Sequence, residues 1–338
     1  GHKMSKSLGN VIDPNDIFKQ MGAEIIRLWV ASVDTSSDVA VSMDVMRQVS
    51  ESYRKIRNTM RFMLANVTDF DLNQNKVAYE DLREVDQYML ARLNEVMTKV
   101  YAAYDEYDFA TVYKLINSFL VNDLSAFYLD VAKDVVYIDA ENDPERRSMQ
   151  TVIYECLVDL TKLLTPILPH TAEEVWSYLS EPEDYVQLAE MPEVKNLVSQ
   201  DTLLVQWSNF MKFRDDVHRA LEEARNEKII GKSLEAAITI YPNTELKNIL
   251  SMLDANLAQL LIVSKLTISD DQVPAAATKF NDFAIKVEHA PGEVCDRCRK
   301  TLTDVGSDTD LPNLCASCAA IVRQEFPEVI EEGFDTNK

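Results

Sequence analysis

Four of the five cysteines in this sequence lie close together and could bind a metal ion. Their spacing is C-x2-C-x16-C-x2-C, formed by Cys295, Cys298, Cys315 and Cys318. Two such pairs typically converge on one tetrahedral zinc ion, and four thiolates leave no open coordination position for water. We therefore predict one structural zinc ion; free buried thiols or disulfides are the alternatives. The fifth cysteine, Cys156, stands alone and is predicted to be a buried apolar residue.

A second group of residues suited to chemistry is Lys3-Met4-Ser5-Lys6-Ser7, which Leu8-Gly9-Asn10 follows. The segment places two ammonium groups and two hydroxyls on a short polar loop. Phosphoryl and nucleotidyl transfer depend on cations that neutralise charge on the phosphate oxygens, so Lys3 and Lys6 are candidates for binding a polyphosphate. An exposed polar loop is the plain alternative. A chance match to the whole pentapeptide is about 1 in 10,000 for a chain of this size.

A row of arginines is the third group. Arg54, Arg57 and Arg61 recur at spacings of three and four, which places them on one face of a helix, with Lys55 and Asn58 beside them. Glu51 is expected to be the only acidic residue nearby. Guanidinium groups bind phosphate bidentately and stack on unpaired bases, so this face is predicted to contact nucleic acid. Ion pairs with carboxylates of neighbouring helices are the alternative.

Three basic residues flank the second cysteine of the first pair: Arg297, Arg299 and Lys300. They could contact RNA, although a solvated and purely structural zinc knuckle fits the spacing equally well.

The overall charge argues against such a role. With 34 basic and 56 acidic residues, the net charge is −22, which repels a polyanion. Local charge can override the total, because a phosphate is influenced most by charges within about 8–10 Å. The sequence has no uninterrupted apolar run of about 18 residues and no signal peptide at its start, so we expect a soluble, cytoplasmic protein without a membrane partner.

The pattern of apolar residues predicts the elements that position these groups. A mainly α fold is expected, with an antiparallel helical bundle followed by a small α/β domain and a zinc-knuckle module. Asp13 and Ser42 are the expected caps of two helices, the first ending at Gly22 and the second near Asn66. Further helices are expected around residues 25–29, 86–104, 108–138, 144–164, 172–179, 209–228 and 245–256, and strands at 236–241, 260–268 and 283–288. Gly231 is expected to end a helix.

These elements suggest four domains, with a linker at residues 181–199. Residues 1–41 carry the lysine loop, 42–190 the bundle, 191–288 the α/β domain, and 289–338 the zinc module with an acidic tail that includes Glu332 and Asp335.

Several of these segments resemble class I aminoacyl-tRNA synthetases. Lys3 to Ser7 matches the second signature of that class, KMSKS, and residues 8–14 continue as in its isoleucine, valine and leucine members. Residues 38–42 and 53–62 look specifically like the isoleucyl type, and residues 166–176 are similar to the group as a whole. A terminal four-cysteine module is typical of the bacterial isoleucyl type.

The resemblance implies that this chain is the carboxy-terminal part of an ATP-dependent ligase. Its bundle would be of the anticodon-binding type, and its partners would be isoleucine tRNA, isoleucine, and ATP with Mg²⁺. Residues Lys3, Met4, Ser5, Lys6 and Ser7 would contact ATP, with Lys3 and Lys6 stabilising the transition state of adenylate formation. A monomer is expected. A valyl- or leucyl-type relative, or a zinc-containing acidic scaffold that binds proteins, are the alternatives.

The same resemblance implies that residues 1–338 are inactive alone. The first ATP signature of the class has two histidines around a glycine, and none of the histidines lies in that setting: His2, His170, His218 and His289. An editing domain is also missing. We therefore expect no ATP–pyrophosphate exchange with isoleucine from a pure sample of this chain, and measurable exchange would contradict the assignment.

Overall fold

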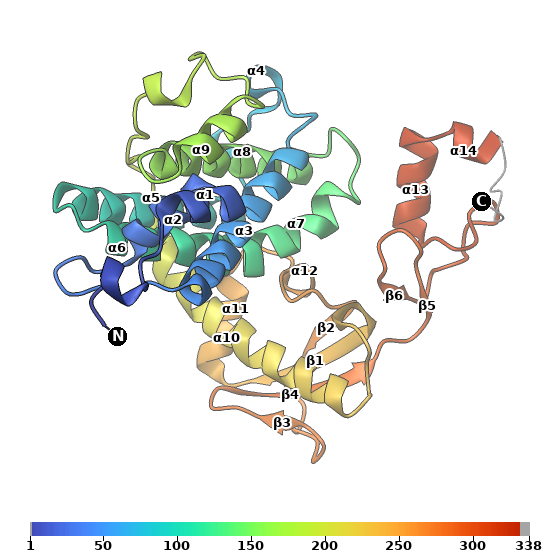
Figure 1. The fold of residues 1–338 in the computed structure, drawn as a ribbon. Helices are drawn as coiled ribbons and strands as arrows, with labels where there is room; N and C mark the ends of the chain where they lie inside the picture. Colours follow the sequence, from blue (N-terminus) through green and yellow to red (C-terminus); the bar gives the residue numbers. More distant parts are fainter. Residues whose placement is uncertain (1, 332–338) are drawn as a thin grey trace. The chain divides into compact units, whose positions relative to one another are not determined.

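The computed structural model describes residues 2–331, apart from the side chains of Val329 and Glu331 (Figure 1). Glu332 and Asp335 of the expected acidic tail lie outside the described residues. The chain forms two compact units. The first comprises the chain up to Lys76, Met89–Leu129 and Gln150–Val198; the second comprises Val77–Tyr88, Asp130–Met149 and the chain from Ser199 onward.

The lysine loop is followed by two short helices, α1 (Pro14–Met21) and α2 (Ala23–Ser32). Asp13 caps α1 by accepting a hydrogen bond from the Asn15 amide at 2.9 Å, and the Gly22 amide closes the helix on the Phe18 carbonyl. Both expected boundaries are confirmed. Buried Ile17, Ile25 and Met46 hold the two helices against the start of the bundle.

A buried carboxylate on α2 caps another helix of the first unit. Glu24 is 8% exposed and accepts hydrogen bonds from the His170 amide at 2.8 Å, from the Thr171 amide at 3.1 Å, and from the Thr171 hydroxyl. These amides belong to the first turn of α9 (Pro169–Trp176), where a negative charge also stabilises the helix dipole. The contact spans about 146 positions of sequence, so no local pattern could predict it.

Replacing Glu24 with glutamine is expected to lower the free energy of unfolding by about 2 kcal/mol, because charge-assisted bonds to buried donors are lost. Urea denaturation would measure this. Asp44→Asn is the matched control: it removes a first-turn carboxylate from another helix of the same unit, but its side chain is 83% exposed, and its effect should be a few tenths of a kcal/mol. Equal effects would contradict the capping role.

The helices of the bundle follow the predicted pattern with three exceptions. One expected helix is interrupted, a short helix at Leu72–Asn75 was not expected, and the helix expected over residues 172–179 runs from Pro169 to Trp176. The helices of the bundle are α3 (Met43–Ala65), α4 (Leu72–Asn75), α5 (Glu84–Asp105), α6 (Phe109–Ser118), α7 (Leu129–Val136), α8 (Pro144–Leu164) and α9, with a 3-10 turn at Tyr79–Asp81. Ser42 caps α3 as expected. The single helix expected over 108–138 is wrong: a π-helix at Phe119–Tyr128 separates α6 from α7. An apolar stripe does not distinguish the two helix types, because burial of Phe119, Phe127 and Tyr128 is compatible with either.

Residues 181–199, where a linker is expected, are mostly irregular, with one 3-10 turn at Val186–Leu188. They are nevertheless fixed to the first unit. The Lys195 amide donates to Asn94 Oδ1 at 2.9 Å, and the Lys195 ammonium pairs with Glu155. The following helix, α10 (Gln200–Asn226), begins at Gln200 rather than near Asn209. Burial of Leu203 and Trp207 explains the earlier start.

The α/β part of the second unit is a four-stranded sheet with the order β2-β1-β4-β3. Its strands are β1 (Ala236–Pro242), β2 (Lys265–Ile268), β3 (Thr278–Lys279) and β4 (Phe283–His289), and its short helices are α11 (Thr244–Met252) and α12 (Leu257–Leu260). Strand β1 pairs with β2 in parallel and with β4 antiparallel. Phe213 of α10 packs edge-on against Phe283 at 5.0 Å between ring centroids.

Three expectations about this unit are wrong. The strand expected at 260–268 begins only at Lys265, because residues 257–260 form α12. The helix expected at 245–256 ends at Met252. Gly231 does not end a helix: α10 ends at Asn226, and Lys228 takes the left-handed conformation (φ 61°) that terminates it. The Gly231 amide instead donates to Glu235.

The cysteine module contains a hairpin of β5 (Glu293–Val294) and β6 (Thr301–Leu302), followed by α13 (Ala316–Glu325) and α14 (Glu328–Glu331). Gly292 has φ +107°, and a Cβ there would lie 2.1 Å from the Leu302 carbonyl oxygen, so only glycine fits. The expected fold class, a helical bundle followed by an α/β unit and a zinc-type module, is confirmed.

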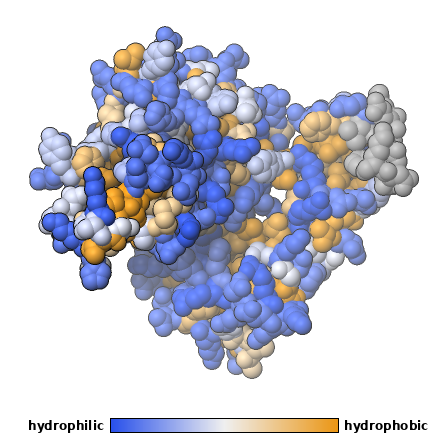
Figure 2. Space-filling model, in the orientation of Figure 1, coloured by the Kyte–Doolittle hydropathy of each residue, from blue (hydrophilic) through white to orange (hydrophobic). Residues whose placement is uncertain are grey.

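Hydrophilic side chains cover most of the face shown in Figure 2. Among the residues that the structure describes, no helix is both long and apolar enough to cross a lipid bilayer.

Candidate nucleic-acid interface and metal centre

The lysine loop is ordered by its own side chains. The Ser5 hydroxyl accepts from the Leu8 amide at 3.2 Å, and the Ser5 amide donates to Asn10 Oδ1 at 2.8 Å. Gly9 closes the short 3-10 turn Lys6–Leu8 in the left-handed conformation. Lys3 and Lys6 are exposed, and neither forms an ion pair with a carboxylate of residues 2–331. Two free ammonium groups, one on a preformed turn and one just before it, are suited to binding a polyphosphate.

The three arginines of α3 lie in different environments. Arg54 pairs with Glu51 at 2.6 Å, one turn earlier on the helix. Arg57 pairs with Glu174 of α9, with 2.8 Å between Nη2 and Oε1. Arg61 is exposed and has no carboxylate partner within the described part of the chain. Glu51 was expected to be the only acidic residue nearby, so Glu174 is a correction; its position 117 residues away cannot be inferred from helical spacing.

The Arg57–Glu174 pair is a surface interaction despite its good geometry. The hydrogen bond with Glu174 raises the pKa of Arg57, and the same bond lowers the pKa of Glu174. The side chains are 45% and 49% exposed, so solvent screening limits the pair to about 1 kcal/mol or less. A phosphate could therefore exchange with Glu174 at little cost.

Arg57 and Arg61 line a groove of about 1090 Å³ in the first unit. Its walls are the second half of α3, the segment around α4, and the end of α9 with the residues that follow it. Tyr178, which is 74% exposed, also lines the groove, and Asp71 and Asn73 add polar groups to its lining. A cation beside an exposed aromatic ring can hold a phosphate and an unstacked base together. Sequence spacing did not indicate Tyr178, Asp71 or Asn73.

The four cysteines of the module converge. Their sulfur atoms all lie within 4.8 Å of one another, and all four residues are buried. Cys298 Sγ and Cys315 Sγ are 3.9 Å apart, which matches the edge of a tetrahedron with Zn–S bonds of about 2.3 Å. The residues thus fit a zinc ion, as predicted. His289, the nearest histidine in sequence, is not part of the cluster.

Crowding of the sulfurs opposes their ionisation in the absence of a cation. The hydrogen bond with Cys318, followed by burial, raises the pKa of the Cys298 thiol. A metal ion reverses this preference, because it binds thiolates and displaces their protons. Cys156, in contrast, is a fully buried free cysteine on α8 and is not part of the cluster, which confirms its expected role as an apolar residue.

The three basic residues of the knuckle have separate partners. Arg299 pairs with Asp296 and is 65% exposed. Lys300 is 26% exposed and lies 3.2 Å from Asp134 of α7. The Arg297 guanidinium points to Cys318, with 3.9 Å between Nη1 and Sγ. The structure therefore does not gather these three cations on one RNA-facing surface.

Comparison with known proteins places these features in a family. Residues 86–240 match the anticodon-binding domain of tRNA ligase, residues 1–42 match tRNA synthetases class I (I, L, M and V), and residues 292–321 match the zinc finger found in FPG and IleRS. The isoleucine–tRNA ligase of Lactobacillus acidophilus is 63% identical over 99% of this chain, and that of Enterococcus faecalis is 57% identical over the same share. The chain belongs to the isoleucine–tRNA ligase family.

The isoleucine–tRNA ligases matched here are longer than this chain, which spans 36% of their length. The matches do not favour a valyl- or leucyl-type relative or a protein-binding scaffold. Among solved structures, the agnB2 LeuRS–tRNA–LeuAMS complex of Agrobacterium radiobacter K84 aligns over 60% of this chain and 23% of its own, with a TM-score of 0.45 and 19% identity. That likeness is too low to add to the assignment.

Proposed function

We propose that this chain is the tRNA-engaging part of an isoleucine–tRNA ligase, which joins isoleucine to its tRNA at the expense of ATP. The observation that carries the proposal is identity of 63% to such a ligase along 99% of the chain. The proposal assigns residues 1–41 to the end of the catalytic domain, 42–190 to the anticodon-binding bundle, 191–288 to the α/β domain, and 289–338 to the zinc module. A monomer in the cytoplasm is the proposed state.

In this proposal, the lysine loop contacts ATP. Lys3 and Lys6 neutralise the charge that grows on the phosphate oxygens and on the leaving pyrophosphate, while Met4, Ser5 and Ser7 shape the turn around them. The supporting observation is that neither ammonium group is occupied by a described carboxylate. Mg²⁺ would accompany ATP and share the task of neutralising its phosphates.

The arginine-lined groove is the proposed contact for the anticodon stem-loop. Arg61, with no carboxylate partner among residues 2–331, is the strongest candidate for a phosphate. Arg57 and Arg54 can join it by exchanging their exposed carboxylate partners, and Asn58 lies on the same helix. Tyr178 is the proposed stacking platform for an unstacked base. In the zinc module, Arg299 is the best placed of the three basic residues to contact RNA, because it is the most exposed.

Replacing Arg61 with glutamine is expected to weaken binding of isoleucine tRNA about tenfold and to lower the slope of log affinity against log salt by about 0.9. The reason is the loss of one cation that neutralises a phosphate. Fluorescence anisotropy with labelled tRNA over a series of salt concentrations would measure both quantities.

The matched control is Arg47→Gln, which removes an arginine from the same helix outside the groove, where it pairs with Asp44. Its slope should equal that of the wild type. Equal losses for the two variants would show that the groove is not the contact. Competition between isoleucine and valine tRNAs tests the amino-acid type separately: equal affinities would contradict the isoleucine assignment without bearing on the groove.

A further inference from the structure

The charge of the metal site requires compensation from the protein. Four thiolates and one Zn²⁺ together carry a charge of about −2, buried among Leu311, Leu314 and Val322. Buried charge is unfavourable unless hydrogen bonds or opposite charges stabilise it. Several donors are already present: the Cys315 amide donates to Cys295 Sγ at 3.3 Å, the Lys300 amide donates to Cys298, and the Cys318 amide donates to Cys315. The Ser317 hydroxyl also lies 3.4 Å from Cys315 Sγ, but none of these donors carries a positive charge.

The cations of the module are mostly committed to carboxylates. Arg299 pairs with Asp296, Lys300 with Asp134, and Arg323 with both Asp308 and Asp310 at 2.7 Å. The hydrogen bond from Arg323 lowers the pKa of Asp308 to about 2. Arg297 differs from the other three: it has no carboxylate partner within residues 2–331, and its guanidinium faces the sulfur of Cys318.

We infer that Arg297 is a positioning residue of the zinc site, whose guanidinium stabilises the thiolate charge on Cys318 and fixes the orientation of that ligand. The supporting geometry is the partly buried Nη1–Sγ contact of 3.9 Å to a sulfur whose residue is 1% exposed. A charged donor to a thiolate in a poorly solvated place interacts more strongly than one in water. Partners of this kind, outside the ligand set itself, change metal affinity by about 10–100-fold.

This role differs from the contact with RNA that the basic pattern of the knuckle suggested. An RNA contact needs a guanidinium free to meet a phosphate, and its loss would change tRNA affinity while zinc binding stays the same. A positioning role predicts that zinc affinity falls while tRNA affinity at saturating zinc stays the same. The two roles can therefore be separated in one set of variants of the whole chain.

The test compares zinc affinity in Arg297→Gln, Arg297→Lys and Arg299→Gln, measured by competition with a chromogenic zinc chelator. We expect Arg297→Gln to weaken zinc binding about 10–100-fold. Arg297→Lys should recover part of the loss, because it keeps the charge but not the planar donor geometry. Arg299→Gln is the matched control, since it removes the same charge from the other side of Cys298, and its zinc affinity should stay within about twofold of the wild type.

Wild-type zinc affinity in Arg297→Gln, or an equal loss in Arg299→Gln, would overturn the inference. A fall in tRNA affinity of Arg297→Gln at saturating zinc would overturn it as well, in favour of an RNA contact. If Arg297→Gln fails to fold, NMR of the cadmium-loaded wild-type chain decides: scalar coupling between the metal and the guanidinium protons of Arg297 is expected, and its absence would contradict the contact. None of these outcomes depends on the aminoacylation function.

Discussion

Replacing Cys298 with serine is expected to reduce the zinc content of the purified chain from about one ion to nearly none and to unfold the cysteine module. The buried cluster around the cysteines contains few other apolar residues, chiefly Leu311, Leu314, Ala319 and Val322. A core this small rarely folds without a metal, and binding of a structural zinc supplies about 10–16 kcal/mol of folding free energy. Elemental analysis and hydrogen exchange would measure the two effects.

Exchange should become fast in residues 292–325 and stay slow in the helices of the first unit, because those helices have their own core. The control is Cys156→Ala, which also removes a buried cysteine but should leave one zinc ion per chain. Full zinc content in Cys298→Ser would contradict a four-thiolate site. Loss of zinc in Cys156→Ala would show that the assay reports general unfolding.

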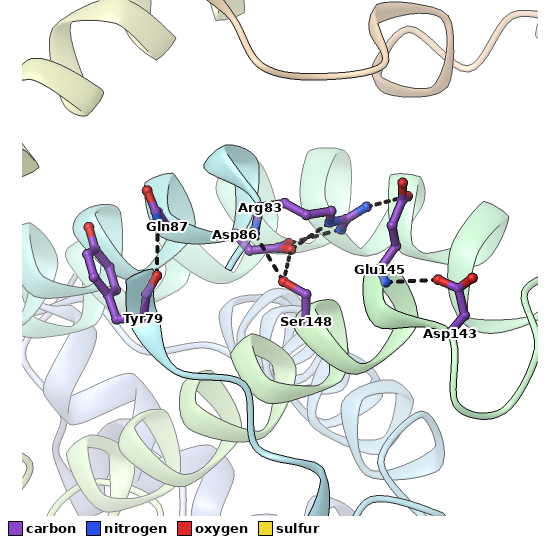
Figure 3. Close-up of polar contacts among 7 residues, drawn as sticks. All are labelled: Tyr79, Arg83, Asp86, Gln87, Asp143, Glu145 and Ser148. Carbon is purple, nitrogen blue, oxygen red and sulfur yellow. Dashed lines mark hydrogen bonds and ion pairs between the residues drawn. The ribbon is translucent and has the colours of Figure 1, made fainter. Parts of the chain in front are cut away.

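The second large effect is expected at a buried ion pair in the second unit, between Arg83 and Asp86 at the start of α5 (Figure 3). Asp86 is fully buried and accepts hydrogen bonds from Nε and Nη2 of Arg83, at 2.7 and 3.0 Å. It also accepts a hydrogen bond from the hydroxyl of Ser148 on α8 at 2.6 Å. Asp86→Asn should lower the free energy of unfolding by about 3 kcal/mol, because it leaves the 18%-exposed guanidinium without its buried anion. Chemical denaturation, followed by a probe of the second unit, would measure the loss.

Glu145 provides the matched control, since it pairs with the same guanidinium at 3.1 Å but is 56% exposed. Glu145→Gln should cost less than about 1 kcal/mol, because water already screens that pair. If both variants lost the same stability, burial would not be what distinguishes the two carboxylates, and the argument from desolvation would be wrong.

Helix caps and the cysteine cluster were predictable from the sequence, because residues close together in the chain form them. The caps at Asp13 and Ser42 follow from side chains that reach amides within three positions. The convergence of the four cysteines follows from their spacing, since the first pair lies on a short turn and the second on the first turn of α13, and one ion can hold both. The π-helix and the short β2 were missed, because several backbone conformations bury the same apolar residues.

The sequence by itself determined which residue types are available: two lysines in a KMSKS loop, arginines on one helical face, and four cysteines with zinc spacing. Only the tertiary structure decided which charges remain free. Arg57 meets Glu174, Lys300 meets Asp134, and Arg297 meets Cys318, whereas Arg61 has no carboxylate partner in the described chain. The physical reason is distance. Helical spacing fixes neighbours within one turn, but these pairs join residues 21 to 166 positions apart, which only the packing of separate elements brings together.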